Sequence, residues 1–214
     1  MGGKGKFVKP VSSIRLRLIL IVSAFFALGA YGASTWLMAD LPVAGRATVV
    51  PGGKARVGGP FALTDHTGKR VSDKDFRGRF MLVFFGYTFC PDICQTGLQT
   101  MGASLEMLGE RADQVAPIFI TLDPKRDTVA VMAGYLANFD RRLIGLTGSA
   151  DEIADVAKAF HAYSAKTGGS DTGDDYLLDH TSIYYLLDEN GDYAAHFPYG
   201  RSAQQIAEEI ARRL

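Results

Sequence analysis

Both cysteines of the chain lie in one short segment, FFGYTFCPDIC, at residues 84–94. Cys90 and Cys94 are separated by three residues, one more than in the common redox motif of disulfide oxidoreductases. In a regular helix this spacing places the two β-carbons about 5–6 Å apart, whereas a disulfide needs about 3.5–4.5 Å. The pair can therefore form a bridge only if the segment bends, and it also suits two sulfur atoms that face one metal ion. The spacing leaves redox chemistry and metal binding both open.

The residues between the cysteines indicate the start of a helix. Pro91 is typical of the first helical position, and Asp92 is typical of the first turn. We therefore expect Cys90 near the N-terminal cap and Cys94 one turn further on the same face. The partial positive charge of the helix N-terminus should lower the pKa of the Cys90 thiol, whereas the charge of Asp92 opposes this effect.

The elements that must position the cysteines alternate between strands and helices. The continuous apolar run at residues 81–85 is typical of a strand buried on both faces of a sheet. We expect short strand segments at 61–64 and 71–76, a second buried strand over 115–124 and an extended piece at 142–149. Helices are expected over 93–112, 127–139, 150–163 and 202–214, and Asp127 or Thr128 should cap the second of them. A hairpin over 181–197 should turn at Asn190-Gly191. This order predicts an α/β, thioredoxin-like single domain with a central mixed sheet flanked by helices.

A histidine is the natural third partner for the two sulfur atoms. Two thiolates are soft ligands that favour Cu(I) or Zn²⁺, and an imidazole suits either metal. Of the four histidines, we interpret His66, His161 and His196 as structural or surface residues. His180 precedes the hairpin strand that, in a thioredoxin-like sheet, lies beside the strand that leads to the cysteines. We therefore regard His180 as the candidate third ligand.

The N-terminal part of the chain differs in composition from the rest. Residues 1–17 carry five basic side chains and no acidic one, and residues 18–39 carry no charge. About 20 apolar residues suffice to span a bilayer, and the basic flank predicts that the tail stays in the cytoplasm. We expect a transmembrane anchor at 18–39, with a cleaved signal peptide as the alternative. Either interpretation places the remainder outside the cytoplasm, where disulfides persist.

Residues 40–52 are rich in Gly, Pro and small side chains and are interpreted as a linker, so that one domain occupies residues 53–214. Beyond the basic tail the chain has 18 basic and 23 acidic side chains, a net charge of −5. Binding to a phosphate backbone requires a clustered basic face. We therefore expect no nucleic acid among the partners.

Three motifs, GYTFCPDIC, TLDPKRDT and YLLDHTSIYYLLDENGDYAAHF, together with the N-terminal anchor, resemble the Sco/SenC family of copper-delivery proteins. The resemblance covers roughly residues 50–214. It implies a thioredoxin-like fold and one copper ion, as Cu(I), Cu(II) or both, held by Cys90, Cys94 and His180. It also implies delivery of copper to the binuclear copper A site of cytochrome c oxidase subunit II.

The resemblance equally allows an enzymatic alternative, in which Cys90 and Cys94 form a redox-active disulfide and the protein acts as a thiol-disulfide reductase on the cysteines of that copper A site. No catalytic residue separate from the metal ligands is expected. The implied location is a bacterial-type inner membrane, with the domain on the periplasmic or the equivalent intermembrane-space side. One departure is Gln95, where the family often has proline after the second cysteine, and this puts the local helix geometry in question.

Two acidic residues and one loop are further candidates for roles near the cysteines. Asp123 ends the second buried strand and should lie at the same sheet edge as the cysteines, either in a strand-end turn or in contact with the site. Asp179 could fix the tautomer of the neighbouring imidazole. The acidic loop at 166–176 lacks the closing glutamate of a calcium loop, so we interpret it as solvated.

Overall fold

A seven-stranded sheet forms the centre of the computed structural model, which describes residues 57–168 and 175–214. These residues belong to one compact unit. The strand order is β2-β1-β5-β4-β3-β8-β9. The strands are β1 (Ala62–Asp65), β2 (Arg70–Ser72), β3 (Phe80–Gly86), β4 (Val115–Thr121), β5 (Ile144–Thr147), β8 (Ile183–Leu187) and β9 (Tyr193–Pro198). Because β3, β4 and β5 are parallel and the outer pairs are antiparallel, the predicted mixed sheet is confirmed.

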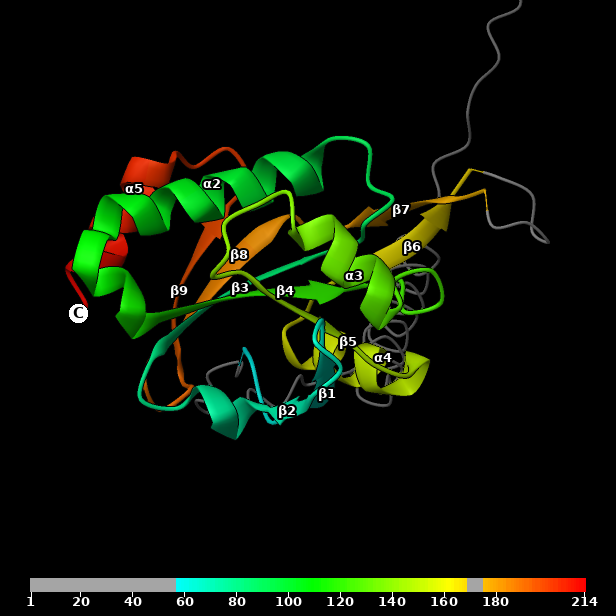
Figure 1. Ribbon diagram of the computed structural model, residues 1–214, viewed down its shortest axis with the longest axis horizontal. Coiled ribbons are helices and arrows are strands. Elements are labelled where there is room, and N and C mark those ends of the chain that lie inside the picture. Colours follow the sequence, from blue (N-terminus) through cyan, green and yellow to red (C-terminus); the bar gives the residue numbers. More distant parts are fainter. Residues whose placement is uncertain (1–56, 169–174) are drawn as a thin grey trace, which may run out of the picture. The chain divides into compact units, whose positions relative to one another are not determined.

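Helices cover both faces of the sheet, and the alternation of side chains along β3 explains why (Figure 1). Phe80, Leu82 and Phe84 pack into a core with the helices α2 (Ile93–Leu108), α3 (Val129–Leu136) and α5 (Ala203–Ala211). The alternate β3 residues Met81, Val83 and Phe85 pack into a second core with α4 (Ala150–Ala159) on the opposite face. Every residue of β3 is buried, as the continuous apolar run predicts.

The helices begin and end at residues with recognisable local chemistry. Thr128, Ser149 and Ser202 cap α3, α4 and α5, each accepting a hydrogen bond from a backbone N–H of the first turn. The helices are shorter than the sequence predicts. α2 ends at Leu108, because Gly109 adopts a φ of 59° and leads into a 3-10 turn, η2 (Gly109–Gln114). A second 3-10 turn, η1 (Asp73–Phe76), follows β2.

Besides the pair β1 and β2, two further hairpins lie in the described residues, and only one of these two is predicted by the sequence. β8 and β9 pair antiparallel around the Asn190-Gly191 turn, in which Gly191 has a φ of 74°. The second hairpin consists of β6 (Ser164–Thr167) and β7 (Leu177–His180), which form a separate two-stranded sheet. The start of the predicted loop at 166–176 is therefore strand and not loop. This hairpin is the element that carries His180.

The predicted tail at 1–17, the predicted span at 18–39 and the predicted linker at 40–52 lie outside the described residues. Within residues 57–168 and 175–214, no helix combines the length and the apolar character needed to cross a bilayer. The anchor therefore stays a prediction from the sequence.

Candidate metal centre

The two cysteines lie where the chain passes from β3 into α2. α2 begins at Ile93, as the apolar period predicts, with Asp92 at the N-cap position, so the interpretation of Pro91 as the first helical residue is wrong. The reason is a tight turn in front of the helix, in which the Cys90 N–H donates to the Tyr87 carbonyl (3.3 Å). Cys94 lies in the first turn of α2. Both side chains are buried, with exposed fractions of 6% for Cys90 and 0% for Cys94.

The structure brings Cys90, Cys94 and His180 together at one point. The Cys94 N–H donates to the Cys90 Sγ over 3.4 Å, and the Cys94 Sγ lies 3.4 Å from the His180 Nε2. One ligand atom from each of the three residues lies within 4.8 Å of the others. Two sulfur atoms and one imidazole nitrogen at such distances form a compact donor set for a soft metal ion.

His180 is oriented by its immediate neighbours. Its Nδ1 lies 3.1 Å from the Thr181 carbonyl, and an Nδ1–H that donates to this carbonyl leaves the Nε2 lone pair free to face the sulfur atoms. The Tyr87 ring meets the imidazole edge to face, with the centroids 5.8 Å apart. The Tyr87 hydroxyl accepts a hydrogen bond from the Leu178 N–H over 3.1 Å and so holds β7 against the cysteine turn.

Of the two acidic candidates, Asp123 lies in the turn after β4, one of the two positions expected for it, whereas Asp179 does not take its expected role. The Thr181 carbonyl, and not the Asp179 carboxylate, lies at the His180 Nδ1. Asp123 is buried, pairs with Arg126 and accepts a hydrogen bond from the Tyr176 hydroxyl over 2.8 Å. The Arg126 guanidinium also lies 3.7 Å from the centroid of the Tyr176 ring. Asp123 therefore ties the start of the β7 segment to the end of β4.

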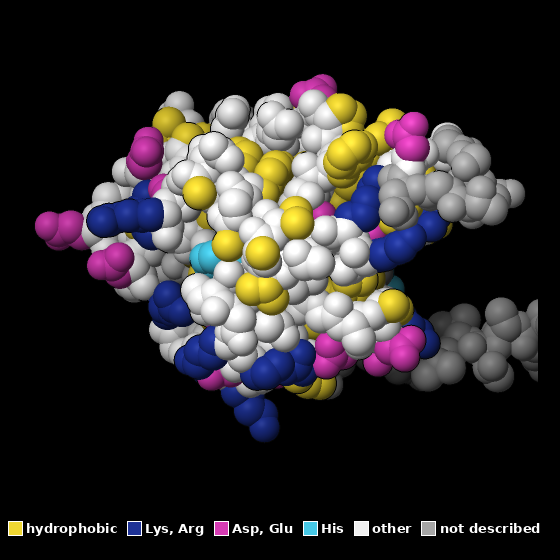
Figure 2. Space-filling model, turned by 45° about the vertical axis from the view of Figure 1, so that its right-hand side comes forward, with side chains coloured by type: hydrophobic (Ala, Val, Ile, Leu, Met, Phe, Trp, Pro, Cys, Tyr) yellow, Lys and Arg dark blue, Asp and Glu magenta, His cyan; other side chains and the backbone are white. Residues whose placement is uncertain are grey.

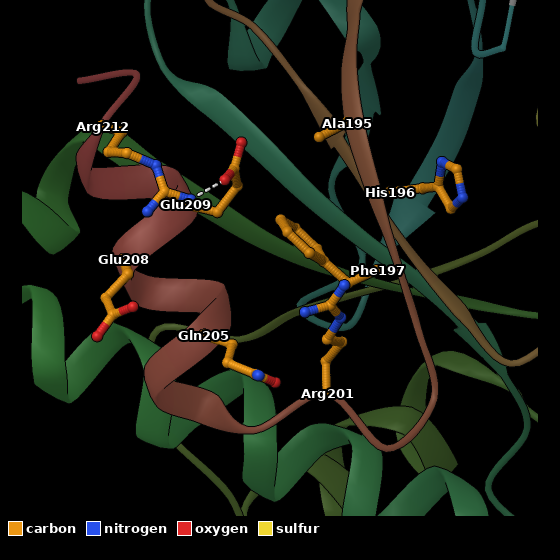
Figure 3. A pocket seen from close by; sticks show the side chains of 8 residues that line it. All are labelled: Ala195, His196, Phe197, Arg201, Gln205, Glu208, Glu209 and Arg212. Carbon is orange, nitrogen blue, oxygen red and sulfur yellow. Dashed lines mark hydrogen bonds and ion pairs between the residues drawn. The ribbon is translucent and has the colours of Figure 1, made fainter.

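The other histidines lie in structural positions, in agreement with their interpretation from the sequence. The Gly145 N–H donates to the Nδ1 of His66 over 3.2 Å. His161 occupies a left-handed turn after α4 with a φ of 54°. The Nδ1 of His196 contacts the Tyr193 hydroxyl over 2.5 Å. His196 borders a polar pocket between β9 and α5, and Figure 3 shows its ring pointing away from the ion pair of Glu209 and Arg212 in that pocket.

The charge states of the two thiols differ because each affects the other. The hydrogen bond from the Cys94 thiol lowers the pKa of Cys90 to about 4 against the effect of burial, and the backbone N–H groups of Asp92 and Cys94 add to this lowering. The same hydrogen bond, together with burial, raises the pKa of Cys94. In the metal-free protein at neutral pH, Cys90 is therefore a thiolate and Cys94 a thiol.

This asymmetry predicts an unusual pH dependence of alkylation. A thiol with an ordinary pKa of about 8.5 loses about 100-fold in thiolate fraction between pH 7 and pH 5. With a pKa of about 4, Cys90 stays mostly ionised over that interval, so its rate of reaction with iodoacetamide should change by less than about twofold and reach half its neutral-pH value only at about pH 4. Peptide mass spectrometry of the reduced protein measures the rate at Cys90, and a 100-fold decrease at pH 5 contradicts the assignment.

Gly86, the last residue of β3, makes room for Cys94. A Cβ at this position would lie 2.6 Å from the Cys94 Sγ and 2.9 Å from the Phe119 Cε2. Gly86→Ala should therefore displace Cys94, destabilise the protein by about 1–3 kcal/mol and weaken copper binding by about tenfold. Chemical unfolding and competition with a copper chelator measure the two effects. The matched control is Gly134→Ala in α3, where an added Cβ meets no described heavy atom within 4 Å. Equal copper affinity in both variants would contradict this role of Gly86.

The site opens to solvent on the side of Cys90 and His180. A groove of about 390 Å³ is lined by these two residues and by Tyr87, Pro91, Asp92, Ile93, Thr167, Leu177, Leu178, Asp179 and Ser182. Cys94 does not line it and lies behind Cys90.

Phe89, Ile93 and Leu177 are large hydrophobic residues of this region with exposed side chains. Figure 2 shows one face of the molecule, on which hydrophobic side chains are spread over the middle and most acidic and basic side chains lie toward the rim. A partner can thus approach the metal ligands through a largely apolar groove.

The fold and the site together define a class of protein, a thioredoxin-like α/β domain with a two-sulfur, one-nitrogen metal centre at the end of a central strand. The model of the SCO1/SenC family matches residues 50–214. An SCO2-like protein of Rickettsia felis is 36% identical over 194 residues, which cover 90% of this chain and 94% of the relative. The chain belongs to the SCO1/SenC family, as its motifs predict.

A human relative and one solved structure extend the comparison. The human "Protein SCO1 homolog, mitochondrial" is 38% identical over 164 residues, which cover 76% of this chain and 54% of the relative. The structure of Bradyrhizobium japonicum ScoI with copper bound is 43% identical, with a TM-score of 0.69, and covers 74% of this chain and 99% of that chain. The copper-bound relative and the donor set of this chain support copper as the metal of the site.

Proposed function

We propose that this protein is a membrane-anchored copper metallochaperone for the assembly of cytochrome c oxidase. Cys90, Cys94 and His180 hold one copper ion, which the protein delivers to the binuclear copper A site of subunit II. The observation that carries the proposal is the approach of the two sulfur atoms and the His180 Nε2 to within 4.8 Å of one another. Membership of the SCO1/SenC family and the copper-bound relative support the choice of metal and of the process.

The arrangement of the ligands suits transfer as well as binding. The Cys90 sulfur and the imidazole border the groove, whereas the Cys94 sulfur is closed off behind them. A thiolate of the client that enters the groove can displace the ligands on the open side first, while Cys94 still holds the ion. A three-coordinate site leaves room for this incoming ligand. Copper thus passes from one protein to the other without release into water.

A transfer experiment tests this function. The copper-loaded protein is mixed with the metal-free, reduced copper domain of subunit II, and the proteins are separated and analysed for metal. We expect copper to move to the client and the absorption spectrum of the binuclear site to develop. Copper that stays on this protein in the presence of excess client would contradict the delivery role.

A second candidate function rests on the different charge states of the two thiols. The Cys90 thiolate can attack one sulfur of a client disulfide and release the other client sulfur as a thiolate. Cys94, after losing its proton, then attacks the Cys90 sulfur, which yields the Cys90–Cys94 disulfide and frees the second client thiolate. Two electrons pass to the client, and an external dithiol must reduce the protein again. His180→Ala should leave this reductase activity largely intact, whereas it should impair copper delivery.

We also propose that residues 18–39 anchor the protein in a bacterial-type inner membrane, with the domain on the periplasmic side. The apolar, uncharged composition of this segment and its basic N-terminal flank support this orientation. The name of the human relative places that protein in mitochondria. Cell fractionation with N-terminal sequencing distinguishes an intact anchor from a cleaved signal peptide.

A further inference from the structure

A buried carboxylate lies beneath the cysteine turn. The side chain of Asp127 is fully buried, with an exposed fraction of 0%, and buried carboxylates require hydrogen-bond partners. It accepts hydrogen bonds from the Thr88 N–H over 3.0 Å, from the Thr88 hydroxyl over 2.6 Å and from the Thr121 hydroxyl over 2.5 Å. The residue types at 127 and 128 predict either Asp127 or Thr128 as the cap of the helix. That position belongs to Thr128, and the Asp127 carboxylate is turned inward instead.

Thr88 connects the Asp127 carboxylate to the cysteine turn. It lies inside the turn that the Cys90 N–H closes onto the Tyr87 carbonyl, so it directly follows Tyr87 and precedes Cys90 by two residues. Tyr87 in turn contacts the His180 ring and holds the Leu178 N–H of β7. A shift of Thr88 would therefore move both Cys90 and the support of His180.

Asp127 is itself fixed from the side opposite the cysteines. Its N–H donates to the Asp123 carbonyl over 2.9 Å, and its carbonyl accepts a hydrogen bond from the hydroxyl of Thr147 in β5 over 2.8 Å. Thr128, the residue after Asp127, caps α3. The carboxylate thus stands on a segment anchored to two strands and a helix, which gives it the rigidity to hold a turn in place.

We propose that Asp127 is a positioning residue for the metal centre, which holds Thr88 so that Cys90, Cys94 and His180 stay within reach of one ion. This inference rests on the proposed copper-binding function and extends it to a residue that touches none of the three ligands. Outer partners of metal ligands typically change the affinity for the metal by about 10–100-fold when they are removed. The effect of Asp127 passes through one intermediate residue, so we expect the lower end of that range.

Two threonine variants provide a matched test, because each removes one hydroxyl from Asp127 and preserves the shape of the side chain. Thr88→Val removes the hydroxyl bond from the cysteine turn and keeps the Thr88 N–H bond, whereas Thr147→Val removes the hydroxyl bond on the opposite side. We expect Thr88→Val to lower the copper affinity about tenfold, to shift the thiolate-to-Cu(II) absorption band and to speed hydrogen exchange at the Cys90 amide of the metal-free protein. Thr147→Val should keep the affinity within about twofold of the wild type at a comparable loss of thermal stability.

Two further variants complete the test. Thr88→Ser keeps the hydroxyl that Thr88→Val lacks, and it should therefore bind copper with the affinity and the absorption band of the wild type. Asp127→Ala removes all three bonds and should weaken copper binding at least as much as Thr88→Val. If Thr88→Val and Thr147→Val bind copper equally well while Cys90→Ala does not bind it, the positioning role is wrong and the proposed function stands. If Cys90→Ala also binds copper like the wild type, the ligand assignment itself is wrong.

Discussion

Replacing either cysteine with alanine should abolish stoichiometric copper binding at micromolar protein concentration. Each thiolate supplies one of only three donor atoms, and the chain has no third cysteine to replace it. Structural metal sites derive several kcal/mol from each ligand, so we expect a loss of at least about a thousandfold in affinity for Cu(I). Competition with a Cu(I) chelator under anaerobic conditions measures the affinity of Cys90→Ala and Cys94→Ala.

A control separates loss of a ligand from loss of structure. Ser104 is fully buried in the same helix as Cys94 and donates to the Met101 carbonyl over 2.7 Å. Ser104→Ala should destabilise the protein by about 1 kcal/mol and leave the copper stoichiometry at one. A cysteine variant that still binds one copper ion with the affinity of the wild type would contradict the assignment of that cysteine as a ligand.

Replacing His180 with alanine should separate the two oxidation states of copper. The two thiolates alone can hold Cu(I), which prefers soft sulfur ligands, whereas Cu(II) gains more from an imidazole nitrogen. We expect a loss of about 10–100-fold in Cu(I) affinity and the disappearance of the stable Cu(II) complex. Chelator competition follows Cu(I), and visible absorption with electron paramagnetic resonance follows Cu(II).

The matched control for this variant is His196→Ala. His196 lies at the pocket between β9 and α5 and contacts the Tyr193 hydroxyl, so its removal deletes an imidazole without touching the cysteines. It should bind both oxidation states like the wild type. A Cu(II) spectrum that is the same in His180→Ala and in the wild type would show that the nitrogen ligand comes from elsewhere.

The sequence predicted those parts of the fold that depend on local patterns. The continuous apolar run of β3, the Asn-Gly turn between β8 and β9 and the helical period of α2 each follow from neighbouring residues. The apolar period placed the start of α2 correctly at residue 93, but Pro91 does not open the helix, because a hydrogen bond from Cys90 to the Tyr87 carbonyl forms a separate turn in front of it. Short-range preferences alone do not reveal which of two adjacent turns the backbone adopts.

The hairpin that carries His180 could not be predicted in the same way. β6 and β7 have four residues each and are mostly exposed, so they show no buried apolar pattern. They are stabilised by pairing with each other, as in Ser164 opposite His180, and by the Tyr87 hydroxyl on Leu178, a contact between residues 91 positions apart. The candidate role of His180 therefore came from its place before a predicted strand and from the family resemblance.

The supporting residues of the site were missed for a related reason. Aspartate is a residue type typical of helix caps, and no neighbouring residue in the sequence indicates that the Asp127 carboxylate reaches Thr88, 39 residues earlier in the chain. Gly86 is an ordinary strand-end glycine until the Cys94 sulfur is placed against it. Such contacts depend on the packing of β3, β4 and α2 and become visible only in three dimensions.

X-ray absorption spectroscopy of the copper-loaded protein, prepared without oxygen, tests the central claim most directly because it counts the donor atoms around the metal. The account predicts two sulfur ligands and one nitrogen ligand per copper ion in the wild type, and the loss of the nitrogen contribution in His180→Ala. A copper ion surrounded by nitrogen and oxygen alone, or a nitrogen contribution that persists in His180→Ala, would contradict it.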